Sequence, residues 1–156
     1  MNQPTSPLQC ASTAANRAHA DPPQGYRPLF RTSPFLDATG PYFYKEQAQG
    51  FTIGLRVAEK HTNASGTVHG GLIATLADVS LGYVTATSQQ PPLRMTTANL
   101  SIDYVGAARP GDWIESHVDI VKTGSRLAFA KALISVDGRP VASTSAVFLV
   151  VGNSGE

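Results

Sequence analysis

The stretch that decides the fold is Gly70–Ser88, GGLIATLADVSLGYVTATS, which runs nineteen residues without a proline. Its large apolar residues recur at helical spacing along one stripe: Leu72, Leu76, Val79 and Tyr83. The stretch contains no Lys, Arg or Glu, and Asp78 is its single charged residue. Because no side of such a helix is charged enough to face water, we predict a helix here that is buried against a sheet.

Runs of apolar residues around this helix predict strands. Phe51, Ile53 and Leu55 alternate with other residues at the period of two that indicates a half-buried strand. Four further runs follow the helix, separated by turns that contain glycine: residues 95–105, 113–122, 127–136 and 141–151. Because short connections favour antiparallel neighbours, we expect an α+β fold, an antiparallel sheet of about five to six strands wrapped around a long central helix.

Length and composition indicate one globular domain. The chain has 156 residues, of which 42% are hydrophobic and 15% charged, enough to bury a core. Residues 1–25 differ from the rest, because they contain four prolines and many small polar residues but few large aliphatic ones. We expect a disordered N-terminal tail over residues 1–25 and one domain over residues 26–156.

Charge and apolar run length argue against several classes of partner. Twelve Lys and Arg against eleven Asp and Glu leave a net charge of +1, too small for nucleic-acid binding through bulk charge. The chain start lacks the basic and apolar segments of a signal peptide, and no apolar run approaches the ~20 residues of a membrane span. The lone Cys10 cannot form an internal disulfide. We therefore expect a cytoplasmic protein with neither a nucleic-acid nor a membrane partner.

Asp78 and the residues before the helix are candidates for chemistry. A buried unpaired carboxylate is costly, so Asp78 pairs with an arginine, reaches solvent at a helix edge, or acts chemically. Gly70 and Gly71 are either a flexible joint or a pair of exposed backbone amides that suit a developing oxyanion. Taken singly, His69 is more typical of a capping residue and Asn63 of a turn.

Together these residues form a longer pattern. Asn63 lies six residues before the triplet His69-Gly70-Gly71, and Asp78 lies nine residues after the histidine. This pattern resembles the signature of the PaaI-like hot-dog acyl-CoA thioesterases. The resemblance continues through Thr96–Tyr104 and covers roughly residues 34–150. It implies a hot-dog fold and hydrolysis of acyl-CoA to CoA and a free carboxylic acid.

The resemblance also implies an assembly and a set of catalytic residues. Two protomers join their sheets edge to edge, the active sites lie between them, and the homodimers commonly pair into homotetramers. Asp78 is the general base or nucleophile, and Thr97 helps it to hold the water. The other subunit contributes the remaining residues: Gly70 and Gly71, whose amides polarise the carbonyl, with Asn63 and His69 shaping that side.

Substrate contacts are less clearly indicated. Basic residues should contact the phosphates of coenzyme A, and Lys122 and Arg126 are candidates, although solvated turn charges are the simpler interpretation of both. Tyr83, Met95 and Phe129 either line the acyl pocket or pack in the core. Aryl, arylacetyl and medium-chain acyl groups all stay open, as does the choice between water activation and a mixed anhydride. The chemistry requires no cofactor, and the histidines show no metal-ligand spacing.

Two alternatives share the fold. A hot-dog dehydratase or hydratase would use His69 as a proton shuttle at the acyl chain. A non-catalytic acyl-CoA binding protein would need an appended effector segment, and residues 1–25 contain neither a helix-turn-helix pattern nor a basic cluster. Asp78 together with Thr97 and the glycine pair favours hydrolysis.

Overall fold

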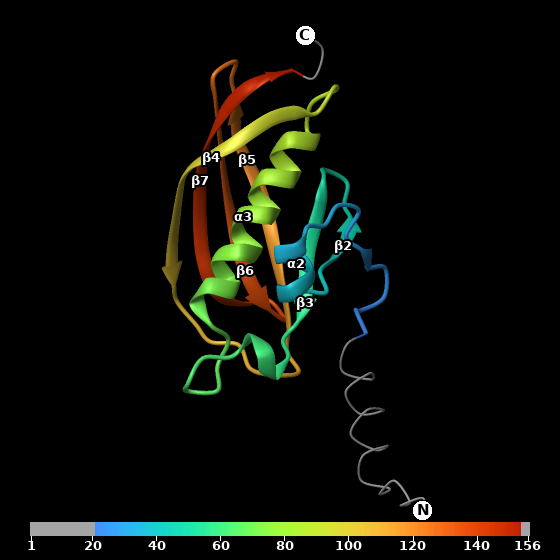
Figure 1. Cartoon of the computed structure of the whole chain (residues 1–156), viewed down its shortest axis with the longest axis vertical. Helices are drawn as coiled ribbons and strands as arrows, with labels where there is room; N and C mark the ends of the chain where they lie inside the picture. The colour runs from blue at the N-terminus through green and yellow to red at the C-terminus, as the bar shows by residue number, and fades with distance from the viewer. Residues whose placement is uncertain (1–20, 154–156) are drawn as a thin grey trace, which may run out of the picture.

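The computed structural model describes residues 21–153, in which a seven-stranded antiparallel sheet wraps around helix α3, Gly70–Thr87 (Figure 1). The strands lie in this order across the sheet: β1 (Arg27–Pro28), β2 (Phe43–Glu46), β3 (Phe51–Arg56), β5 (Trp113–Thr123), β6 (Leu127–Val136), β7 (Arg139–Asn153) and β4 (Leu93–Tyr104). Two short helical segments precede α3: α2 (Pro34–Thr39) and the 3-10 turn η1 (Glu59–His61). The predicted antiparallel sheet around a long central helix is confirmed.

Helix α3 is buried on the side that its apolar stripe predicts. Leu72, Leu76 and Val79 are buried, whereas Tyr83 at the end of the stripe is half-buried. One flank of the helix is not buried, and its residues are small or polar: Gly71, Ala74, Thr75, Asp78 and Gly82. A helix that the sheet covers on one side therefore leaves a second, small-residue side uncovered within one chain.

Small side chains let the sheet approach the helix closely. Along β6, Ala128, Ala130 and Ala132 are buried at every second position, and the residues between them are more exposed. This alternation places the alanines on the face that packs against α3. Large side chains from β3 and β7, among them Ile53, Leu55 and Phe148, fill the remainder of the core.

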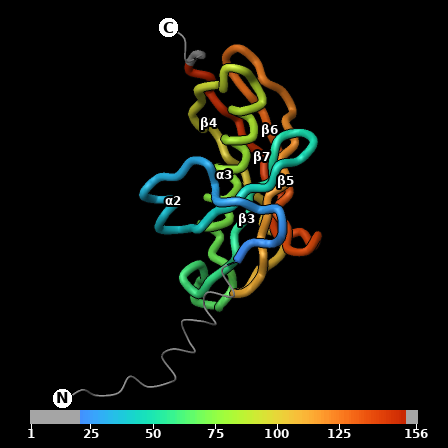
Figure 2. The backbone as a smooth tube through the Cα atoms, turned by 90° about the vertical axis from the view of Figure 1, so that its right-hand side faces the viewer, coloured from blue at the N-terminus to red at the C-terminus, as the bar shows by residue number. Residues whose placement is uncertain are grey.

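Helix α2 is short and is capped by its own residues. The Ser33 hydroxyl accepts a hydrogen bond from Leu36 N and caps the helix, and Pro34 occupies its first turn. Leu36 is its buried residue. Figure 2 shows that α2 lies on the same side of the sheet as α3 and farther from the strands.

The sheet contains seven strands, more than the five to six expected, because β1 and β2 comprise two and four residues. Runs so short give no readable period of two.

Most of the expected tail, residues 1–20, lies outside the described residues, so its boundary stays a prediction. At Asp21, the backbone carbonyl accepts a hydrogen bond from Arg56 Nη2 at 3.1 Å. Within residues 21–153, no helix is both long enough and apolar enough to span a lipid bilayer.

Candidate active site

Asp78 and Thr97 meet at the middle of the molecule. Asp78 lies on the uncovered side of α3, and Thr97 lies on β4 at a register shift in its pairing with β7. The Thr97 hydroxyl donates a hydrogen bond to Asp78 Oδ1 at 2.7 Å. Among the described residues, Oδ2 of Asp78 has no hydrogen-bond partner, so one carboxylate oxygen is fixed and the other is free to accept a proton or to attack.

The two residues line a cavity of about 940 Å³ between α2, α3 and the start of β4. This volume lies within the range of small-molecule sites, roughly 300–1,000 Å³. Much of the lining is apolar and includes Leu36, Val79, Tyr83, Met95 and Phe148. Tyr83 and Met95 therefore border the cavity, whereas Phe129 is not among its lining residues.

The His69 imidazole caps the start of α3. Its Nδ1 accepts a hydrogen bond from Gly71 N at 2.9 Å, so the neutral ring carries its proton on Nε2. A Cβ on Gly71 would lie 3.0 Å from that Nδ1, which explains a glycine at this position. The Gly71 amide is thus already engaged with His69.

The Gly70 amide is differently placed. The Tyr104 hydroxyl donates to the Gly70 carbonyl oxygen at 3.0 Å, and a Cβ on Gly70 would lie 3.3 Å from the Tyr104 ring. The Gly70 N–H has no hydrogen-bond acceptor within the part of the chain that the structure describes. Of the two amides expected to polarise a carbonyl, Gly70 is the one left free.

Asn63 organises the loop before the helix. Its side-chain Oδ1 accepts hydrogen bonds from Ser65 N at 2.9 Å and Thr67 N at 3.3 Å. Its Nδ2 donates to Thr67 Oγ1 at 3.0 Å. The amide of Asn63 is therefore committed to its own loop, and in a single chain it shapes the site by fixing that loop.

His61 is a loop residue that sequence reasoning missed. It is 4% exposed, its Nδ1 accepts from Ala58 N at 2.9 Å, and its carbonyl accepts from His69 N at 2.8 Å. Burial, reinforced by the charge of Lys60, lowers the pKa of His61, although carbonyl groups at the end of α2 oppose this. A neutral His61 thus anchors the loop that carries His69. A lone histidine in a polar loop gives no sequence signal of this role.

Asp78 and Gly70 of one chain are too far apart to act on one carbonyl. They are eight residues apart on the same helix, about 12 Å along its axis. A nucleophile or base and an oxyanion donor must each lie about 3 Å from the same reacting group. Within one chain, the two groups to which the resemblance assigns catalytic roles therefore do not meet.

The cations expected to contact the substrate lie elsewhere. Lys122 is exposed on β5, opposite Phe129 of β6, and Arg126 is exposed in the turn before β6. Neither lines the Asp78 cavity. Two other arginines do, Arg31 before α2 and Arg94 on β4, and neither belongs to a motif that sequence reasoning singled out.

Comparison with known proteins identifies the family. A profile of the thioesterase superfamily matches residues 65–143. The "Putative esterase PA0474" of Pseudomonas aeruginosa is 51% identical over 127 residues, which cover 81% of this chain and 95% of that protein. The chain belongs to the thioesterase superfamily. It has the hot-dog fold, as the resemblance implied, and it is a thioester hydrolase.

Two more thioesterase superfamily relatives extend the comparison. Acyl-coenzyme A thioesterase 13 of Mus musculus is 39% identical over 77 residues, covering 49% of this chain and 54% of that protein. A "Hypothetical Thioesterase Protein with Coenzyme A" from Streptococcus pneumoniae aligns with a TM-score of 0.68 and 25% identity, covering 76% of this chain and 91% of that one. Coenzyme A is therefore a ligand within this structural group.

Proposed function

We propose that this thioesterase superfamily member hydrolyses acyl-CoA thioesters at a site built from two chains. Asp78 and Thr97 of one chain supply the group that activates water or attacks, and the Gly70 amide of the partner polarises the carbonyl. The observation that carries the proposal is the 2.7 Å hydrogen bond from Thr97 to Asp78, inside a cavity large enough for a substrate.

The arrangement of Asp78 suits thioester hydrolysis. The Thr97 hydroxyl holds Oδ1, so Oδ2 has a fixed direction toward the substrate. A water attacks the thioester carbon while Oδ2 accepts its proton, or Oδ2 attacks directly and water cleaves the resulting anhydride. In both routes the C–S bond breaks, the thiolate leaves and takes up a proton, and Asp78 is regenerated.

Negative charge on the carbonyl oxygen requires a hydrogen-bond donor. The Gly70 amide lies at the first turn of α3, where the helix dipole favours negative charge. His69 leaves it free by binding the neighbouring Gly71 amide. Because His69 Nδ1 is engaged as a helix cap, Nε2 is the ring nitrogen left to contact a substrate.

The edge of the sheet supports a homodimer. Strand β4 carries Thr97, pairs with β7 on one side, and has no partner strand on its other side among the described residues. Two β4 strands joined antiparallel about a twofold axis set the two α3 helices antiparallel as well. Asp78 of each chain then faces the start of the partner's α3.

A thiol-release assay tests the function. The parent protein is expected to release free thiol from acyl-CoA thioesters, assayed with aryl, arylacetyl and medium-chain acyl groups. Asp78→Asn keeps the shape but accepts no proton, so the rate should fall about 10²–10⁴-fold with the fold intact. Asp119→Asn, in an exposed ion pair with Lys131, is the matched control and should keep the parent rate. Near-parent turnover by Asp78→Asn, or no thiol release by the parent from any of these thioesters, contradicts the proposal.

A further inference from the structure

Two arginines line the Asp78 cavity, and no group of the described residues neutralises either of them. Arg31 and Arg94 are both exposed, and within residues 21–153 neither guanidinium has a hydrogen bond or an ion pair. Arg27 is paired with Glu46 and Arg56 with backbone carbonyls, whereas Arg109 and Arg126 also have no side-chain partner among these residues but do not line the cavity. Unpaired cations at a cavity are available to a ligand.

The two arginines come from separate parts of the chain. Arg31 lies two residues before the Ser33 cap of α2, and Arg94 is the second residue of β4. The fold brings both to one cavity, and among the described residues that line it Asp78 is the one other charged side chain. The cavity lining therefore carries two positive charges and one negative charge, and the negative charge belongs to the reacting group.

The guanidinium groups of Arg31 and Arg94 favour an anionic ligand. A guanidinium keeps its charge at every physiological pH and presents a planar set of N–H donors that matches carboxylate and phosphate oxygens. The apolar lining, which includes Val79, Met95 and Phe148, suits the uncharged part of an acyl or pantetheine chain. A neutral substrate would leave both arginines unused.

We propose that Arg31 and Arg94 bind an anionic group of the thioester substrate at one end of the Asp78 cavity. The anion is either a carboxylate at the far end of the acyl group or a phosphate of coenzyme A. The inference rests on the proposed function for the identity of the substrate. Because the pair does not touch the reacting atoms, it sets substrate affinity and leaves the chemical step unchanged.

The test compares the double variant Arg31→Gln/Arg94→Gln with the parent and with Arg109→Gln, an exposed arginine outside the cavity. Three thioesters separate the two sources of the anion. Hexanoyl-CoA carries phosphates, adipyl-N-acetylcysteamine carries a terminal carboxylate, and hexanoyl-N-acetylcysteamine carries neither. Steady-state thiol release gives KM and kcat for each protein and thioester.

The double variant should raise KM about 10-fold or more for the thioester that carries the recognised anion, with kcat nearly unchanged. A rise for hexanoyl-CoA identifies a coenzyme phosphate, and a rise for the adipyl thioester identifies an acyl carboxylate. The Arg109→Gln variant should match the parent throughout. An unchanged KM for both anionic thioesters, or an equal rise for hexanoyl-N-acetylcysteamine, overturns the proposal.

Calorimetry separates this inference from the proposed function, because it requires no turnover. The parent and the double variant are titrated with desulfo-CoA and with adipate. Weaker binding of one of these anions by the double variant supports the arginine pair even if the parent hydrolyses no thioester. If the double variant binds both anions as tightly as the parent does, the inference is wrong, whatever the hydrolysis assay gives.

Discussion

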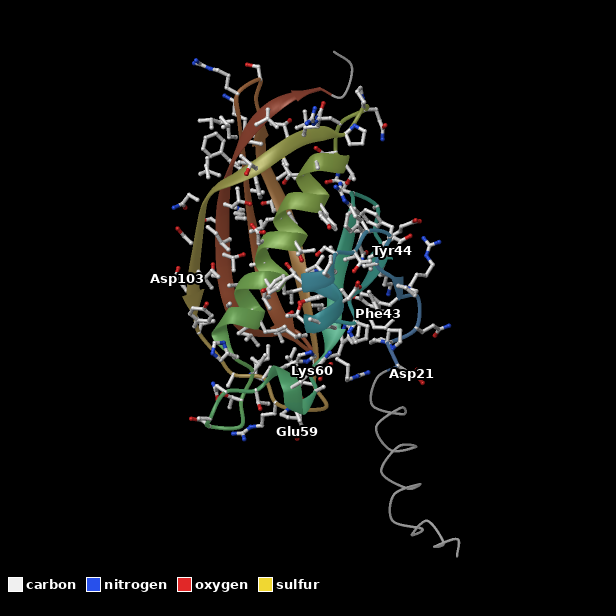
Figure 3. The ribbon with its side chains drawn as sticks, in the orientation of Figure 1. Asp21, Phe43, Tyr44, Glu59, Lys60 and Asp103 are labelled. Carbon is white, nitrogen blue, oxygen red and sulfur yellow. The ribbon has the colours of Figure 1, made fainter. Side chains whose placement is uncertain are left out.

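The two edge strands of the sheet, β1 and β4, differ in length, in exposure and in how their residues are paired. Strand β1 is two residues long, Pro28 has no N–H to offer, and Arg27 is paired with Glu46. Strand β4 is twelve residues long and largely exposed. Figure 3 places the labelled Asp103 at the β4 edge and Tyr44 near the opposite one. One edge is closed to another strand, and the other is open to it.

The residues around β1 and β4 also differ in what they contact. Near β1, the rings of Phe30, Tyr44 and Phe51 pack edge to face, with centroids 5.3–5.9 Å apart. On β4, by contrast, Thr97 contacts Asp78 and Tyr104 contacts Gly70. The open edge and the candidate active site therefore belong to the same strand, so pairing at β4 and catalysis should be lost together.

Like charges on β4 should have the largest effect. Asn99 and Ser101 are exposed on this strand, and Asn99→Asp/Ser101→Asp places four negative charges along a twofold β4 pair. We expect dissociation to monomers and a rate loss of at least about 100-fold, since the partner's oxyanion donor is removed. Light scattering and thiol release measure the two effects.

The matched control places the same charges one strand inward. Ser143 and Ser145 are exposed on β7, and Ser145 is the register partner of Ser101. Ser143→Asp/Ser145→Asp should stay dimeric and active. A charged β4 variant that is monomeric yet fully active would show that the site needs no second chain.

Away from both edges, Glu115 of the central strand β5 should affect stability and not assembly. Burial alone would raise the pKa of Glu115, but hydrogen bonds from Tyr26, His117 and Trp113 lower it below its usual value. A depressed pKa contributes stability above the unfolded-state value of about 4.3, and this contribution is lost as the pH falls through the folded-state pKa. Glu115→Gln should therefore destabilise the fold by about 1–3 kcal/mol at pH 7, with the difference from the parent shrinking below about pH 4.

Thermal melts between pH 3 and pH 7 measure this difference. Asp119→Asn, on the same strand in an exposed ion pair, is the control and should shift stability by less than about 1 kcal/mol. The Glu115→Gln protein should remain a dimer with the parent kcat. If the stability difference between Glu115→Gln and the parent did not change with pH, the hydrogen bonds would not be acting by stabilising ionised Glu115.

The smallest effect is expected at the closed edge itself. Arg27→Gln breaks the exposed ion pair with Glu46, which should change the free energy of unfolding by less than about 1 kcal/mol. Assembly and turnover should be those of the parent. If this variant dissociated to monomers, the partner chain would bind at β1 and not at β4.

Sequence periodicity predicted the elements that are long enough to show it. Residues 70–88 predicted a helix because their apolar stripe extends over about three turns, and the strand from Phe51 showed a clear alternation. Strand β1 and helix α2 contain two and six residues and escape such patterns. The capping pair Ser33-Pro34 was the readable signal for α2.

The site was predictable only in part. The resemblance named Asp78 and Thr97, which a hydrogen bond joins in the structure, and their catalytic roles stay a prediction. Nothing in a sequence shows that His69 occupies the Gly71 amide, because that depends on a side-chain rotamer. Arg31 and Arg94 could not be found either. They meet at one cavity through the fold, and neither belongs to a spaced motif.

Mixed dimers test the central claim, a site shared between two chains. Asp78→Asn removes the base, and Gly70→Pro removes the amide N–H at a first-turn position where proline is tolerated. Each variant alone should be inactive, whereas Gly70→Ala, which keeps the N–H, should retain activity. Coexpressed and randomly paired, the two inactive variants should regain about a quarter of the parent rate, because one site in each heterodimer is intact. A heterodimer no more active than the separate variants would contradict the account.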